Sequence, residues 1–85
     1  MKIRINHNLQ CEVDQKKDDC KREPAHCHIT KGSSGRVAQV WLNPVILESG
    51  HGLDRSEVDE VLSVVQANRY ELEHAYRYNA EHGAD

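Results

Sequence analysis

Residues 24–44 read PAHCHITKGSSGRVAQVWLNP, which is the pattern of a β-hairpin. In the first part, small or apolar residues alternate with polar ones, so that His26 and His28 share one face of a predicted strand. The Gly and Ser residues of 32–35 form the turn, and an apolar strand returns over residues 36–42. The final proline ends this strand, because proline has no N–H to donate to a central ladder.

A long amphipathic helix is predicted over residues 54–80. Asp54 is suited to cap its first turn, and Glu57 stands three residues further on, which is the spacing of a capping box. At about 100° per residue, one apolar stripe contains Val58, Val61, Leu62, Val65, Leu72 and Tyr76. The helical part from about Arg55 to Asn79 is roughly 37 Å long at 1.5 Å per residue and overhangs a small sheet. We therefore expect a second copy of the chain to cover the end near Tyr76.

One residue breaks this stripe, because Arg69 points into its middle beside Asn68. One interpretation is a kink at Asn68, and another is an arginine that extends its charged end to water at the edge of the sheet. A third is a guanidinium held at an interface, where it binds a carboxylate or a phosphate.

The remaining segments complete a single domain over residues 1–85. Residues 1–13 alternate in polarity around an Asn-rich turn and predict a first hairpin, whereas residues 14–24 are almost wholly charged and predict a mobile loop. The second hairpin and an apolar edge segment occupy residues 25–47. The predicted fold class is α+β, with a small antiparallel sheet of three or four strands and one long C-terminal helix packed across it.

Composition limits both the size of the core and the class of protein. Only 18 of 85 residues are Leu, Ile or Val, and there is no Phe, so we expect a marginal hydrophobic core. The net charge is -3, divided between a basic first half and an acidic second half. This division is typical of solvated surface, and it also fits self-association, a basic partner or weak contact with RNA. No apolar run is long enough to cross a membrane, and no leader segment is recognisable.

The three cysteines, Cys11, Cys20 and Cys27, favour a reduced cytoplasmic protein. Their odd number argues against a disulfide framework, and they lack the CxxC spacing of a structural zinc site. We predict no metal site and no cofactor. Cys27 alternates with Ile29 and is expected to be a small core residue, whereas Cys20 lies among charges.

His26 and His28 are the candidate catalytic residues. Histidines on one face of a strand lie about 7 Å apart, so both can act on one reacting group or one metal ion. As a general acid and base they would cleave RNA, with Lys31, Arg36 or Arg69 stabilising the phosphate. A metal site would require a third ligand, such as His7 or His51. A structural or surface role for both histidines is the remaining interpretation.

A second group of residues is predicted to bind a partner rather than to catalyse. Tyr70, His74 and Tyr78 form a polar aromatic patch on the helix face that points away from the core, where a contact surface and ordinary solvated surface are both possible. The candidate binding residues are Arg36, Trp41, Arg69, Tyr70, His74 and Tyr76. Trp41 also fits a place in the core.

The segment Pro24-Ala25-His26-Cys27-His28-Ile29, the segment Ala38-Gln39-Val40-Trp41-Leu42-Asn43-Pro44 and the capped helix follow one another in a characteristic order. This order resembles a family of small bacterial proteins of unknown function, marked by a Pro-Pro-His-x-His strand, a Trp-Leu-x-Pro strand and one C-terminal helix. The chain departs from that pattern at Glu23 and Ala25. The resemblance implies a small α+β fold, a focus on His26 and His28, and gene neighbourhoods that are toxin–antitoxin-like or mobile. It implies no activity.

These observations predict a non-enzymatic interaction module. It would act as a homo-oligomer or as one half of a toxin–antitoxin-like pair, with a small cognate protein as its partner. The first alternative is a histidine-dependent, ribonuclease-like toxin that uses His26 and His28. The second alternative is a metal-binding protein.

Overall fold

A computed structural model describes residues 1–13, 24–49 and 52–82, with backbone alone for residue 49 and residues 79–82. The strands are β1 (Lys2–Arg4), β2 (Leu9–Glu12), β3 (His26–Lys31), β4 (Arg36–Leu42) and β5 (Val45–Ser49). They form one antiparallel sheet in the order β1-β2-β3-β4-β5. A short 3-10 turn η1 (Gly32–Ser34) joins β3 to β4, and the helices are α2 (Arg55–Ala67) and α3 (Arg69–His82). The fold class is therefore α+β.

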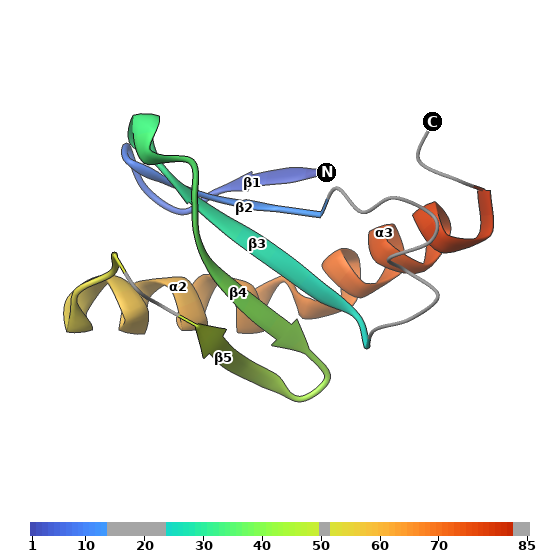
Figure 1. The fold of residues 1–85 in the computed structure, drawn as a ribbon. Helices are drawn as coiled ribbons and strands as arrows, with labels where there is room; N and C mark the ends of the chain where they lie inside the picture. The colour runs from blue at the N-terminus through green and yellow to red at the C-terminus, as the bar shows by residue number, and fades with distance from the viewer. Residues whose placement is uncertain (14–23, 50–51, 83–85) are drawn as a thin grey trace.

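The two helices lie end to end along one face of the sheet, as Figure 1 shows. The core between these layers is formed by Leu9, Cys11, Val13, Cys27, Ile29, Ala38, Val40, Leu42, Val61, Val65, Leu72 and Tyr76. Val61, Val65, Leu72 and Tyr76 are the helical members, and all four belong to the apolar stripe that the sequence pattern predicts. The helical periodicity thus identifies the face that packs on the sheet.

The register of the strands determines which residues share a face. Cys11 pairs with both Ile3 and Ile29, and Ile29 pairs with Ala38, so this row lies on the face that the helices cover. The next row is polar and consists of Arg4, Gln10, Thr30 and Arg36, one residue from each of the first four strands. Because side chains alternate along a strand, this polar row belongs to the opposite face.

The sheet has five strands rather than the predicted three or four. The difference lies in residues 45–47, which the sequence pattern left open between an edge strand and an apolar bridge. Asn43 and Pro44 form a tight turn with a cis peptide bond between them, and Leu42 pairs with Val45 directly across it. The chain therefore reverses at once, and β5 continues to residue 49 as an edge strand.

The predicted single helix is interrupted at Asn68, so the structure contains two helices. Asn68 leaves helical geometry with φ -115° and ψ 15°, and its side-chain Nδ2 donates to the carbonyl of Val64 at 2.8 Å. This local bond competes with regular helix formation. The kink interpretation of the break in the stripe is confirmed, and Leu72 and Tyr76 remain in phase with Val61 and Val65.

The charged loop predicted over residues 14–24 lies, apart from Pro24, outside the described residues. In the described part, no helix is long and apolar enough to cross a membrane.

Candidate functional site

His26 and His28 lie in a cluster of four rings where the start of β3 meets α3. The His26 ring centroid is 5.2 Å from that of His28, 5.6 Å from that of Trp41 and 5.2 Å from that of Tyr76. Trp41 is the cross-strand partner of His26 on β4, whereas Tyr76 comes from the helical layer. Three elements therefore surround His26, and it is only 2% exposed.

The hydrogen bonding of His26 indicates a structural role. Its Nδ1 lies 3.0 Å from the carbonyl oxygen of Pro24, and because a carbonyl only accepts, the proton is on Nδ1. A general acid or base must reach its substrate, but the other rings cover His26. Of the two candidate catalytic residues, only His28 is partly exposed.

Two of the three basic residues considered for phosphate binding, Lys31 and Arg36, lie towards the other end of the hairpin. Lys31 and Arg36 are near the end of the β3–β4 hairpin where η1 joins the two strands. Along the strands, Lys31 is about 17 Å from His26, and Arg36, which pairs with Thr30, is about 13 Å from it. Lys31 donates to the carboxylate of Glu57 at 2.9 Å and to the carbonyl of Gly52 at 3.1 Å. The structure therefore brings His26 and His28 together, but it places Lys31 and Arg36 at the opposite end of their hairpin.

The metal-binding alternative gains no support from the described residues. Across residues 1–13, 24–49 and 52–82, no group of three or more His, Cys, Asp or Glu side chains could hold a metal ion. His7 lies in the β1–β2 turn, beside the Gly32 end of β3, because the N–H of Gly32 donates to the carbonyl of Asn8. His26 begins β3, at the opposite end of this strand, so His7 is too far from His26 to bind the same metal ion. His51 lies outside the described residues.

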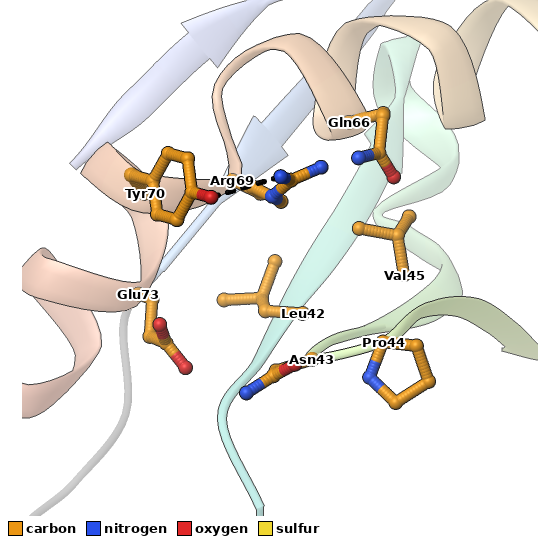
Figure 2. Close-up of a pocket in the computed structure, with 8 residues that line it drawn as sticks. All are labelled: Leu42, Asn43, Pro44, Val45, Gln66, Arg69, Tyr70 and Glu73. Carbon is orange, nitrogen blue, oxygen red and sulfur yellow. Dashed lines mark hydrogen bonds between the residues drawn. The ribbon is translucent and has the colours of Figure 1, made fainter.

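A cavity of about 290 Å³ lies between the β4–β5 turn and the junction of α2 with α3. It is lined by Leu42, Asn43, Pro44, Val45, Gln66, Arg69, Tyr70 and Glu73. Figure 2 shows Asn43 and Pro44 on one side, the helical residues on the other, and the apolar side chains Leu42 and Val45 between them. The Trp-Leu-x-Pro segment and the residue that breaks the helical stripe thus meet at one site.

Arg69 and Tyr70 form one wall of this cavity as an ordered pair. The Arg69 guanidinium donates to the Tyr70 hydroxyl at 2.9 Å, and its central carbon lies 4.6 Å from the Tyr70 ring centroid (Figure 2). On the next turn, Glu73 accepts from Arg77 at 3.2 Å. Guanidinium, amide, hydroxyl and carboxylate groups therefore stand around an apolar floor, which is the composition of a polar protein interface.

The outward side of α3 continues this surface. Tyr70 is 73% exposed and Tyr78 is 55% exposed, and His74 is exposed between them. These residues follow one another at four-residue steps, so they lie along one side of the helix. We call Tyr70, His74, Arg77 and Tyr78 the α3 outer face.

Tyr76 differs from the expectation, because it is 3% exposed within a single chain. It packs against His26 and belongs to the core, so it is not available to bind a partner. The core of a single chain therefore already covers Tyr76 at this end of the helix. Trp41 is half-buried, and its ring packs against His26. Arg36 is exposed opposite Thr30.

The sequence pattern missed several residues of these sites. Asn43, Gln66 and Glu73 line the cavity only because the β4–β5 turn closes beside the helix break. A second, polar cavity of about 180 Å³ is lined by Arg4, His7, Asn8, Gln10, Thr30 and Gly32. Its residues come from three separate segments, and no local sequence motif predicts the strand register that brings them together. The proline after Trp41 and the stripe-breaking Arg69 were the available signals for the larger cavity.

Comparison with models of protein families gives a match over residues 16–77, to a family described as a domain of unknown function, DUF4160. The match covers most of the chain, including both the β3–β4 hairpin and the two helices. No curated protein and no solved structure gives a significant match.

Proposed function

The chain belongs to the DUF4160 family, whose function is unknown, and from this premise we propose that it is a non-enzymatic protein-binding module. The proposed contact surface is the α3 outer face together with the cavity beside it. The observation that carries the proposal is the 73% exposure of Tyr70 at the rim of that cavity. Large exposed aromatic side chains next to a cavity are typical of surfaces that a partner covers.

The composition and order of this surface favour a protein partner. Tyrosine and arginine are enriched where proteins contact one another, and both occur here twice, as Tyr70 with Arg69 and Tyr78 with Arg77. The hydrogen bond between Arg69 and Tyr70 already restricts both side chains. Less conformational entropy is then lost when a partner orders them, which favours binding.

The competing ribonuclease proposal has weaker support. It requires two accessible imidazoles and a basic residue beside them, but His26 is 2% exposed, and Lys31 is paired with Glu57. Among the partner classes expected from the sequence, a protein fits a polar aromatic surface best, either a second copy of the chain or a small cognate protein.

Site-specific photo-cross-linking tests the proposal. The photoreactive amino acid p-benzoylphenylalanine replaces Tyr70 or Tyr78 in the full chain, and Asp59, which is exposed on α2, provides the matched control position. We expect protein adducts from positions 70 and 78 and few from position 59. Adducts with a second copy and adducts with another protein both support a protein-binding module.

A quantitative measurement follows for the cross-linked protein, which is purified and titrated against the chain by calorimetry. Tyr70→Ser is expected to weaken binding at least tenfold, which corresponds to about 1.4 kcal/mol. Ser63→Ala, an exposed change on α2, is expected to leave the affinity unchanged. Equal adduct yields at all three positions, or an unchanged affinity for Tyr70→Ser, would contradict the proposal.

A further inference from the structure

Resting on the proposed function, we propose that the α3 outer face binds the same face of a second copy of this chain, with the two helices antiparallel about a two-fold axis beside His74. The helix–helix contact joins residues 70–78 of the two copies. The order of residues along α3 makes a second copy of the chain the partner of this binding surface.

The segment 70–78 reads YELEHAYRY and is nearly symmetric about His74. Tyrosines stand four residues before and four residues after it, at Tyr70 and Tyr78. Glu73 lies just before it and Arg77 three residues after it, so that one acidic and one basic residue flank the centre. In an antiparallel pair centred on His74, each residue lies at the level of the residue of the second copy that is equally far from His74 on the other side. A segment with this order is therefore complementary to itself, as an interface between identical chains requires.

The burial pattern places His74 at the centre of the exposed side. At about 100° per residue, the direction midway between buried Leu72 and Tyr76 is nearly opposite to that of His74. Tyr70 and Tyr78 lie about 40° to either side of His74, along a ridge of four-residue steps. The α3 outer face is therefore a ridge pointing directly away from the core, and its large side chains are exposed.

The charges on the two sides of this ridge are complementary across the proposed axis. Glu73 and Arg77 share one edge of α3 and form a 3.2 Å ion pair within the chain. A two-fold axis brings Arg77 beside the same edge of the second copy, about 3 Å along the helix axis from the level of the second copy's Glu73. The Arg77 side chain is 69% exposed, so it can bind a carboxylate of the other copy.

The same arrangement brings aromatic residues of the two copies to the same level. It places Tyr78 at the level of the second copy's Tyr70, and Arg77 beside the face of that ring, where a cation–π contact forms. A contact of two helical turns per copy is smaller than a standard stable interface, so the dimer is weak and depends on concentration. The complementary charges then determine the orientation more than the strength of the contact.

Charge exchange tests this arrangement in the full chain by sedimentation equilibrium from about 10 to 500 μM. We expect wild-type chain to dimerise in this range, and Arg77→Glu alone and Glu73→Arg alone each to raise the dimer Kd about tenfold or more, because like charges then face each other. An equimolar mixture of the two variants is expected to form a heterodimer with near wild-type affinity. Asp59→Arg, an exposed charge change on α2, provides the control and should dimerise like wild type.

The antiparallel orientation is tested by disulfide formation in a Cys20→Ser background. Tyr70→Cys and Tyr78→Cys chains are expected to cross-link with each other when mixed, and much less with themselves. Efficient cross-linking of each variant with itself would indicate parallel helices and would overturn the proposed symmetry. Circular dichroism of each variant verifies the fold, which these exposed positions should not disturb.

The outcomes separate this inference from the proposed function. Wild-type chain that stays monomeric at 500 μM, with adducts from positions 70 and 78 to another protein, overturns the second-copy inference and leaves the protein-binding function standing. Monomeric chain without any adducts at these positions contradicts both. Dimerisation that is insensitive to Arg77→Glu overturns the proposed interface.

Discussion

Lys31 at the end of β3 and Glu57 in the first turn of α2 form an ion pair of 2.9 Å that joins the sheet to the start of the helical layer. The same carboxylate oxygen, Oε1 of Glu57, accepts from the backbone N–H of Asp54 at 3.0 Å. In return, Asp54 accepts from the backbone N–H of Glu57 at 2.7 Å, which completes the capping box. One carboxylate thus holds both the helix terminus and its contact with β3.

We predict that this carboxylate makes stability depend on pH. Hydrogen bonds from the Asp54 backbone and from Lys31 lower the pKa of Glu57 below its usual value of 4.5. Because the folded-state pKa is the lower one, the stabilisation is present above the unfolded-state pKa and is lost as the pH falls through the folded-state pKa. Glu57→Gln keeps an acceptor for the cap but removes the charge. Its melting temperature should therefore lie below that of wild type at pH 7, and the two should converge towards pH 3.

Thermal melts by circular dichroism from pH 7 to pH 3 measure this convergence. Asp59→Asn removes an exposed acidic group from the same helix and serves as the control, for which we expect a much smaller pH-dependent difference. A constant gap between Glu57→Gln and wild type across this range would show that the charge of Glu57 has no part in the effect.

Asn6 makes a second connection between sheet and helix. Its side-chain oxygen accepts from the backbone N–H groups of Asn8 and Leu9 at 2.8 and 2.9 Å, and its Nδ2 donates to Glu60 at 2.9 Å. Asn6→Asp preserves the acceptor but places a carboxylate against that of Glu60. We predict a loss of about 0.5–1.5 kcal/mol at pH 7, which is recovered in part by adding Glu60→Gln.

Urea unfolding of the four chains of this double-mutant cycle measures the coupling between the two positions. A coupling free energy of about 0.5–1 kcal/mol is expected for two residues in direct contact. Strictly additive losses would mean that the contact between Asn6 and Glu60 contributes nothing to stability.

The parts of the fold that the sequence predicted depend on local information. Alternating polarity identified the β3–β4 hairpin, and the three-residue spacing of Asp54 and Glu57 identified the helix start, where the capping box is confirmed. The fifth strand depended on how sharply the chain turns at Asn43 and Pro44. Neither the two-residue period of strands nor the 3.6-residue period of helices predicts such a turn.

The candidate site was less predictable because burial depends on contacts distant in sequence. Tyr76 was expected to need a partner, but His26, which lies 50 positions earlier, covers it together with the rest of the core. The cavity likewise combines Asn43 with Gln66 and Glu73. The pattern that placed Tyr70 and His74 on an outward face needed only the helical period, and both residues are exposed.

We predict that His26 is required for stability. His26→Ala removes a ring that contacts three other rings and leaves a void, so the free energy of unfolding should fall by about 2–4 kcal/mol. His28→Ala, at the partly exposed position on the same strand, should cost less than His26→Ala. Urea unfolding followed by circular dichroism measures both. A fully stable His26→Ala variant that has lost RNA cleavage shown by wild type would instead favour a catalytic role.

Cys11 and Cys27 give a prediction about reactivity. Both are fully buried on adjacent strands, and the hydrogen bond with Cys11 and burial raise the pKa of the Cys27 thiol well above its usual value. Because both thiols are buried in the core, neither cysteine should react while the protein is folded. In a Cys20→Ser background, we expect no rapid reaction with 5,5'-dithiobis(2-nitrobenzoic acid) at pH 7.5 and reaction of both thiols in urea. The rate should rise with urea as the protein unfolds, because opening of the core limits access. Rapid reaction of one thiol without urea would place that cysteine outside the core and contradict the packing of β2 against β3.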